Sequence, residues 1–246
     1  MSESSRSHVT LTTSGLTLLV PAKSDAERDA VSEAFEEAGG SVVRLYRFWE
    51  PPSLDPRCTK VYGNETFCLV VADILGLNLV SPENEFVVSL DEKWLGRRMW
   101  VVHLDQCWTL NYPVFVKPEI PKAFKARVYV SADDLFFECR GLPSDTRVVV
   151  SEPVNFMAEV RAFVLDGNIL DVSPYEGKCD TTAARDFLSD LAQTPKTPRA
   201  VVLDAGLLES GRWVCIEANA SWGAGLNGCD ARRILPSIVA ACEYGS

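Results

Sequence analysis

Near its carboxyl-terminal end, the sequence contains two apolar, strand-like segments that each carry one carboxylate, and this pattern leaves few folds open. Residues 200–207 contain Asp204, and residues 213–218 contain Glu217. A two-residue turn at 210–211 predicts an antiparallel hairpin in which Asp204 lies opposite Glu217. A four-residue connection gives the same pairing, whereas a three-residue loop would break it. Since directly opposed side chains lie about 5 Å apart at their β-carbons, the hairpin predicts two adjacent carboxylates.

These two carboxylates need a positive partner, because like charges in an apolar strand pair repel each other and lose hydration. Asn219, two residues beyond Glu217, returns to the same face of the strand. Oxygen donors without a nearby His or Cys suit magnesium better than zinc, and magnesium commonly takes one or two carboxylates plus substrate phosphates. The pattern therefore predicts a magnesium site at Asp204, Glu217 and Asn219. The alternative, acids on a solvated sheet face, fits the apolar neighbours at 201–203 less well.

The composition argues against several other classes of protein. The chain has 246 residues, of which 47% are hydrophobic, so it can bury a sizeable core in one large or two small domains. Its formal net charge of -10 opposes nucleic-acid binding. No run approaches the roughly 18 to 20 apolar residues of a membrane helix. Because residues 1–8 also lack the apolar core of a signal peptide, we expect a cytoplasmic location and no membrane partner.

The cysteines and histidines point away from zinc clusters, disulfide frameworks and hydrolases with a histidine base. The eight cysteines are scattered and never form a Cys-x-x-Cys pair. His8 and His103 are the two histidines, and we interpret His103, within an apolar run, as a packed or hydrogen-bonded residue. The Ser-His and Cys-His nucleophile schemes therefore lose their support.

The first hundred residues have an α/β pattern. A strand at 16–20, a helix at 26–38 and a strand at 41–46 predict a βαβ unit. The segment 24–27 reads as a capping box for the first helix. A second, largely buried helix is predicted to begin after Asn64, and a short third one at 81–82.

From about Pro113, the pattern changes to short apolar strands, which favours a mostly antiparallel sheet. A helix at 180–192 precedes the hairpin, and a helix at 231–242 follows it. The predicted strands before the hairpin are 114–116, 127–130, 147–150, 157–165 and 169–172.

Several motifs resemble those of ATP-grasp enzymes. Asp204 followed by Glu217-Ala218-Asn219 is similar to the closing metal-binding signature of that family, an Asp and then Glu-x-Asn. Lys117, at the end of an apolar strand, resembles the lysine that touches the nucleotide phosphates. The segment 149–152 resembles the hinge that hydrogen-bonds adenine. Glu159 and Arg161 resemble the ribose- and phosphate-facing positions of the next strand. The motifs occur in the order that the family has, over residues 98–240.

The resemblance implies an α/β (α+β) protein with a pre-ATP-grasp domain at 1–110 and a nucleotide- and metal-binding ATP-grasp domain at 111–246. Within the family, the chain resembles a compact subgroup of predicted amino-acid or peptide ligases. The implied activity is ATP-dependent joining of a carboxylate to an amine through an acyl phosphate, with release of ADP and phosphate. Two alternatives use the same fold: a nucleotide-binding interaction module without turnover, and an ATP-dependent small-molecule kinase.

The resemblance also implies roles for individual residues. Arg161 and Lys117 are the expected catalytic residues, and ATP and Mg²⁺ are the expected cofactors. A small-molecule carboxylate and an amine are the expected partners. Residues expected to contact the nucleotide are Arg98, Lys117, Lys125, Val150, Ser151, Glu152, Val154, Glu159, Arg161 and Ile216. Residues expected to contact the acceptor substrate are Ser221, Trp222, Gly225, Asn227 and Arg232.

Three features depart from the family pattern or imitate another. The loop 118–127 is basic rather than glycine-rich, so Lys122, Lys125 and Arg127 are candidates for neutralising phosphates by charge, with a solvated loop as the alternative. Arg98 is the expected phosphate-binding arginine of the compact subgroup, and Arg97 is its rival. The segment 223–228 matches Gly-x-Gly-x-x-Gly, but no strand with an acidic residue follows it about 20 positions later, as a dinucleotide site requires.

Overall fold

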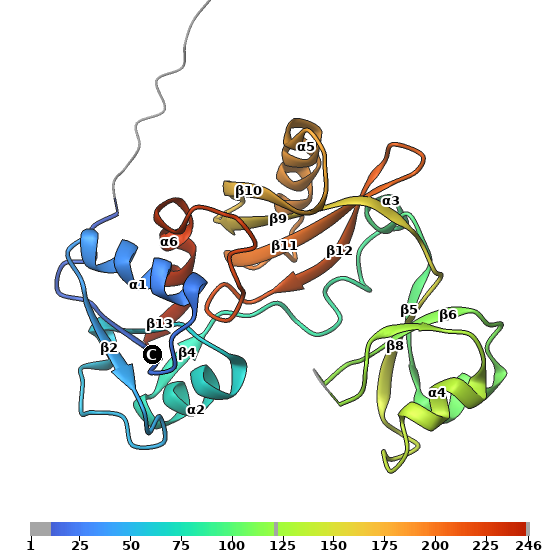
Figure 1. Cartoon of the computed structure of the whole chain (residues 1–246), viewed down its shortest axis with the longest axis horizontal. Helices are drawn as coiled ribbons and strands as arrows, with labels where there is room; N and C mark the ends of the chain where they lie inside the picture. Colours follow the sequence, from blue (N-terminus) through green and yellow to red (C-terminus); the bar gives the residue numbers. More distant parts are fainter. Residues whose placement is uncertain (1–10, 121–122, 245–246) are drawn as a thin grey trace, which may run out of the picture.

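The computed structural model describes residues 11–120 and 123–244. Predictions for residues 1–8, and for Lys122 of the basic loop, lie outside this range. The protein is elongated, with three β-sheet units in a row along its long axis (Figure 1). None of the described helices is long and apolar enough to cross a lipid bilayer.

The first unit is the predicted βαβ arrangement. Its sheet has the order β2-β1-β3, and β1 pairs in parallel with both neighbours. Asn64 caps the second helix as predicted, because its side chain accepts a hydrogen bond from the backbone N–H of Phe67. The elements are β1 (Thr17–Pro21), α1 (Ala26–Glu37), β2 (Ser41–Leu45), η1 (Pro56–Cys58), β3 (Thr59–Val61) and α2 (Glu65–Leu75).

Two local predictions in this unit are wrong. Asp25, not Ser24, caps helix α1 by accepting the N–H of Arg28, and Ser24 instead donates to Asp29. Glu27 consequently has no capping role. The segment 81–90 forms turns rather than a helix, and the next helix is α3 (Glu92–Leu95).

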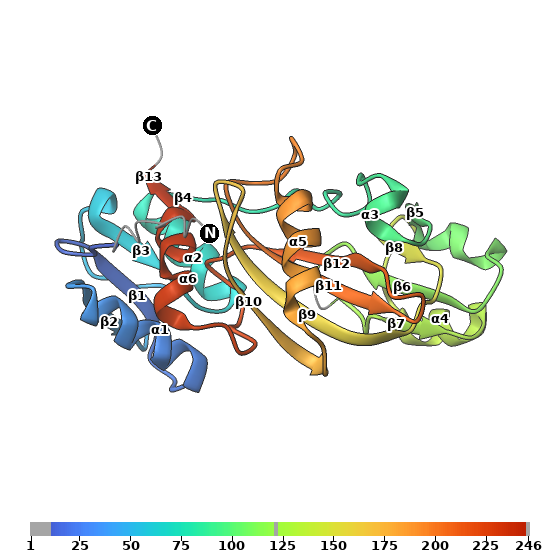
Figure 2. The same ribbon diagram turned by 90° about the horizontal axis from the view of Figure 1, so that it is seen from above.

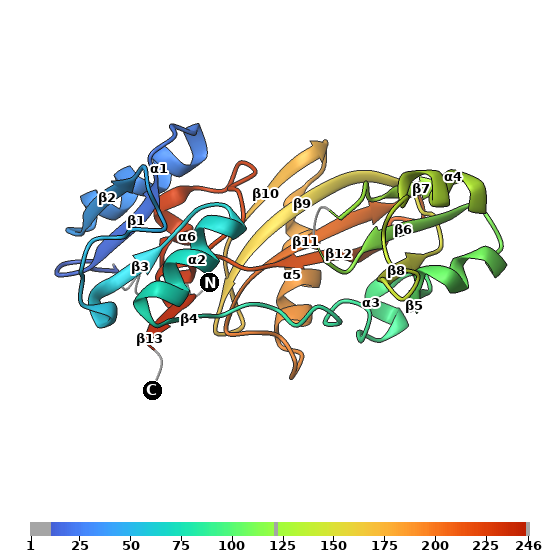
Figure 3. The same cartoon turned by 90° about the horizontal axis from the view of Figure 1, so that it is seen from below.

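The end of the described chain returns to this first unit. Helix α6 (Ala231–Ala240) packs beside α1, and β13 (Cys242–Tyr244) pairs antiparallel with β4 (Leu77–Leu79). Figures 2 and 3 show α6 between α1 and the central sheet. The shared core contains residues from both ends of the sequence: Leu18, Val20, Phe35, Ile234, Leu235 and Ile238.

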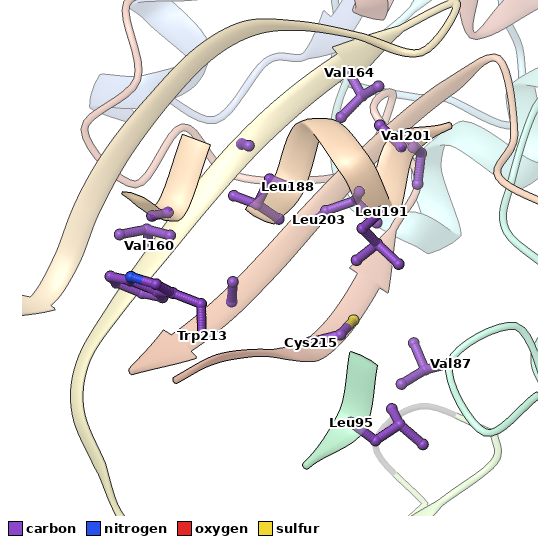
Figure 4. Close-up of a cluster of buried hydrophobic side chains, with 14 of the residues drawn as sticks. Val87, Leu95, Val160, Val164, Leu188, Leu191, Val201, Leu203, Trp213 and Cys215 are labelled. Atoms are coloured by element: carbon purple, nitrogen blue, oxygen red, sulfur yellow. The ribbon is translucent and has the colours of Figure 1, made fainter. Parts of the chain in front are cut away.

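The central unit is an antiparallel sheet of order β10-β9-β11-β12. Helix α5 (Thr181–Ala192) covers one face, where Val160, Leu188 and Leu203 belong to a buried cluster (Figure 4). Alternate residues of the same strands therefore lie on the opposite face. The strands are β9 (Phe156–Leu165), β10 (Asn168–Gly177), β11 (Ala200–Leu208) and β12 (Trp213–Asn219).

The third unit is a small antiparallel sheet of order β5-β8-β6-β7, backed by helix α4 (Ala132–Glu138). Strand β5 precedes residue 110, yet it pairs with β8. The boundary at 110 stays a prediction. The mixed α/β composition and the mostly antiparallel sheets confirm the predicted fold class. The other elements are β5 (Met99–His103), η2 (Leu104–Thr109), β6 (Val114–Pro118), β7 (Arg127–Tyr129) and β8 (Arg147–Ser151).

Candidate active site

The predicted opposition of Asp204 and Glu217 is confirmed, but the predicted turn is wrong. The N–H of Leu208 donates to the carbonyl of Arg212, which closes a three-residue loop. With that loop alone, Asp204 would face Ile216. A β-bulge between Asp204 and Ala205 shifts the register by one residue and restores the pairing of Asp204 with Glu217.

The bulge also decides which side chains reach the site. Neighbouring residues of a regular strand point to opposite faces, yet Ile216 and Glu217 both line one cavity. Cys215, the residue before them, lies in the core beneath helix α5. The irregular register therefore presents an apolar side chain and a carboxylate side by side.

Arg161 of β9 is the positive partner that the carboxylates require. Its Nε and Nη2 donate to the two carboxylate oxygens of Asp204 at 2.8 and 2.6 Å, and Nη2 lies 3.8 Å from Oε1 of Glu217. Asp204 is 1% exposed, and Arg161 is 8% exposed. Burial raises the pKa of Asp204 to about 6, and the bonds from Arg161 offset only part of this effect.

The donor set fits a magnesium ion. Asn219 donates through Nδ2 to Oε1 of Glu217 at 2.8 Å, which leaves its amide oxygen on the strand that carries both groups. Each carboxylate oxygen has a second lone pair beyond the one used here. Among the described residues, no three His, Cys, Asp or Glu side chains lie close enough to hold a metal ion together. A cation at Asp204, Glu217 and Asn219 would therefore rely on ligand oxygens as well, as magnesium commonly does.

Two cavities meet beside these residues. The smaller, of about 250 Å³, opens between the central and small sheets and is lined by Arg97, Ser151, Phe156 and Glu159 among others. The larger, of about 660 Å³, extends toward the first unit and is lined by Asn64, Ser81, Asn219 and Trp222 among others. Three residues line both cavities: Met99, Lys117 and Glu217.

Most residues predicted to contact a nucleotide come together in the smaller cavity. Those that line it are Lys117, Ser151, Glu152, Val154, Glu159 and Ile216. The hydroxyl of Tyr175 donates to Glu159 at 2.7 Å and orients that carboxylate. Met99, Phe115 and Phe156 also line the cavity; the sequence did not indicate them, because their alternation in apolar strands resembles that of any core residue.

Other predicted residues lie away from both cavities. Val150 is fully buried in the small sheet, and Lys125 is exposed on the loop that leads into β7. Arg98 is exposed and faces Trp100, whereas its rival Arg97 lines the smaller cavity and donates to Ser151 Oγ at 3.1 Å. The neighbouring Arg127 forms a bidentate ion pair with Asp134 in the small unit.

The predicted acceptor residues divide in a similar way. Trp222 lines the larger cavity, and its Nε1 donates to the carbonyl of Val80 at 3.1 Å. The carbonyl of Gly225 accepts from Nη1 of Arg161 at 3.0 Å. Ser221 is fully buried against Ser237, at 2.7 Å between the hydroxyl oxygens.

The last two acceptor residues are engaged by helix α1. The backbone N–H of Asn227 donates to Glu27 at 2.8 Å. Arg232 forms a bidentate pair with Glu37 at the surface, at 2.7 and 2.8 Å. Neither residue lines the described cavities.

Comparisons with known proteins agree with this arrangement. Residues 94–236 match a family model described as an ATP-grasp domain, family 2 of its clade. No curated protein sequence matches the chain.

The chain is similar in structure to several solved ATP-grasp proteins. One is an ATP-grasp RimK domain protein from Sphaerobacter thermophilus (TM-score 0.60, 13% identity, covering 91% of this chain and 100% of that one). Another is the D-alanine–D-alanine ligase from Bacillus anthracis (TM-score 0.55, 12% identity, 92% and 97%). A third is the ATP-grasp ligase PsnB, in complex with a precursor peptide and AMPPNP (TM-score 0.54, 14% identity, 96% and 99%).

At these identities the structural matches establish a shared fold. The family model goes further, because it covers more than half of the sequence and includes the hairpin, Lys117 and Arg161. The chain therefore belongs to the ATP-grasp family.

Proposed function

We propose that this protein is an ATP-dependent carboxylate–amine ligase, which forms an amide through an acyl phosphate and releases ADP and phosphate. The observation that carries the proposal is the position of Lys117 and Glu217 on the wall common to two cavities. The buried pair of Arg161 and Asp204 lies directly beside Glu217. One cavity can then hold the nucleotide and the other the substrates, with the phosphates at their junction.

The smaller cavity suits the adenosine part of ATP. Its walls combine apolar side chains, such as Phe115 and Ile216, with the polar segment 151–152 that follows β8. A flat base requires such apolar walls and a few polar groups that fix its orientation. Glu159, held by Tyr175, is proposed to accept hydrogen bonds from the ribose.

At the junction, Lys117 and Arg161 are proposed to stabilise the charge of the transferring phosphoryl group. Mg²⁺, bound by Asp204, Glu217 and Asn219, would neutralise the phosphate oxygens. The amino-acid side chains form no covalent bond to the substrate in this scheme. They orient the two reactants, balance charge and exclude water.

The larger cavity is proposed to hold the carboxylate and the amine. Similar solved structures include a D-alanine–D-alanine ligase and a ligase in complex with a precursor peptide. These names support an amino acid or a peptide as the substrate class. Trp222 forms part of the cavity wall and is proposed to contact the acceptor.

The test is incubation of the purified protein with MgATP and pools of amino acids and short peptides, with ADP, phosphate and product mass followed together. The ligase predicts equal amounts of ADP and phosphate, and a new mass equal to the two substrates minus one water. ADP without phosphate, together with a phosphorylated product, would identify a kinase. Nucleotide binding without ADP in any mixture would identify a binding module and refute the proposal.

A further inference from the structure

Glu27 connects the first unit to the loop that follows the metal-binding strand. It lies in the first turn of α1, where Asp25 already provides the helix cap. Its two carboxylate oxygens accept the backbone N–H groups of Leu226 and Asn227, at 3.0 and 2.8 Å. These partners lie about 200 residues later in the sequence, so the contact holds two distant segments together.

The acceptor of this contact is a small anion-binding concavity in the glycine loop, residues 223–228. Two successive backbone N–H groups converge on the carboxylate, and Asn227 has a φ of 47°, as expected for a backbone nest. A β-carbon on Gly225 would lie 2.6 Å from Oε2 of Glu27 and 3.9 Å from Nη1 of Arg161. Glycine is therefore needed for the close approach of Glu27.

The glycine loop in turn holds Arg161. The carbonyl of Gly225 accepts from Nη1, while Nε and Nη2 of the same guanidinium bind Asp204. This carbonyl is the partner of Arg161 that does not belong to the proposed metal-binding set. It can keep the buried guanidinium hydrogen-bonded and oriented independently of that set.

We propose that Glu27 is a positioning residue: it fixes the glycine loop so that the Gly225 carbonyl keeps Arg161 aligned beside Asp204 and Glu217. The inference rests on the proposed function, because it assigns Glu27 to the same reaction. Glu27 lines neither cavity. Its loss therefore reduces the rate of the chemical step and leaves the affinity for nucleotide nearly unchanged.

The experiment compares Glu27→Ala, Glu27→Gln and Gly225→Ala with wild type, with Glu36→Gln as the matched control. Glu36 is exposed on the same helix. In Glu27→Ala, hydrogen exchange at the Leu226 and Asn227 amides should accelerate at least about ten-fold, because two charge-assisted bonds are lost. ADP formation should fall at least about ten-fold, while the affinity for MgAMPPNP changes less than about two-fold.

Glu27→Gln retains one acceptor oxygen and should give intermediate values for exchange and rate. Gly225→Ala should reproduce the effect of Glu27→Ala by displacing the carboxylate without removing it, since the obstructed atom is the end of a flexible side chain. Glu36→Gln should match wild type in every measurement. Should Glu27→Ala fail to fold, the Gln and Gly225→Ala variants carry the same comparison.

Unchanged exchange at Leu226 and Asn227 would refute the contact. Faster exchange with an unchanged rate of ADP formation would refute the positioning role. If wild type forms no ADP with any substrate, the proposed function fails separately, and the Nε–Hε NMR signal of Arg161 then decides. An identical signal in wild type and in Glu27→Gln would show that Glu27 does not position Arg161.

Discussion

Removing Arg161 should destabilise the protein in a pH-dependent way. Asp204 is 1% exposed, and both of its carboxylate oxygens accept bonds from Arg161. Arg161→Met leaves this carboxylate buried without its partner, a change that typically costs about 3–5 kcal/mol. The cost should be largest at pH 8, where the stranded carboxyl group is ionised.

The sign of the pH dependence follows from the raised pKa of Asp204. In the folded protein this pKa is about 6, against an ordinary value of 3.8. A raised folded-state pKa contributes stability below the unfolded value, and that stability is lost as the pH rises through the folded value. For wild type, this group alone should therefore add about 1.4 kcal/mol between pH 8 and pH 5. Arg161→Met should gain more, because the variant loses the partner that lowers the pKa.

Urea denaturation followed by tryptophan fluorescence, at pH 5 and pH 8, measures both quantities. Arg127→Met is the matched control: its partner Asp134 has a lowered pKa, so that pair titrates below this pH range. Adding Asp204→Asn to Arg161→Met should cost less than the sum of the single changes by at least about 1 kcal/mol. An equal cost of Arg161→Met at both pH values, or additivity within about 0.5 kcal/mol, would refute the reasoning.

Three further outcomes are expected from the site. Glu217→Gln should abolish ADP formation with little effect on the denaturation midpoint, since this side chain is 41% exposed; retained activity would remove Glu217 from the proposed metal set. Lys117→Ala should weaken ATP binding in calorimetry by about ten-fold or more, through loss of a cation at the phosphates, whereas Lys196→Ala, exposed beyond α5, should not; equal affinities would contradict the proposed position of the phosphates. Arg97→Ala should destabilise the protein by about 2–4 kcal/mol, because Ser151 and the carbonyls of Leu95 and Cys215 lose a buried charged donor; an unchanged urea midpoint would contradict this.

Sequence patterns predicted the elements well where local signals dominate. The βαβ unit, the helix capped by Asn64 and the long strands of the central sheet all follow from periodicity and capping residues. The pairing of Asp204 with Glu217 was correct for an incomplete reason, because a longer loop and a bulge cancelled each other. A bulge depends on packing against neighbouring strands, which no local pattern records.

Long-range contacts account for what the sequence did not indicate. Glu27 looked like a capping residue, since its partners in the glycine loop are remote. The lining of the smaller cavity by Arg97 rather than Arg98 depends on how the segment before β5 meets Ser151. Asn64 and Ser81 line the larger cavity only because the first unit folds against the central sheet.

The pairing of β4 with β13 has a consequence for synthesis on the ribosome. Strand β4 appears early, but its partner at Cys242–Tyr244 emerges only after about 160 further residues have been translated. Helix α6, which fills the core beneath α1, is equally late. The first unit therefore cannot complete its native contacts during translation, although the two sheets between can form earlier. Until then, part of its apolar surface stays available to chaperones or to misassembly.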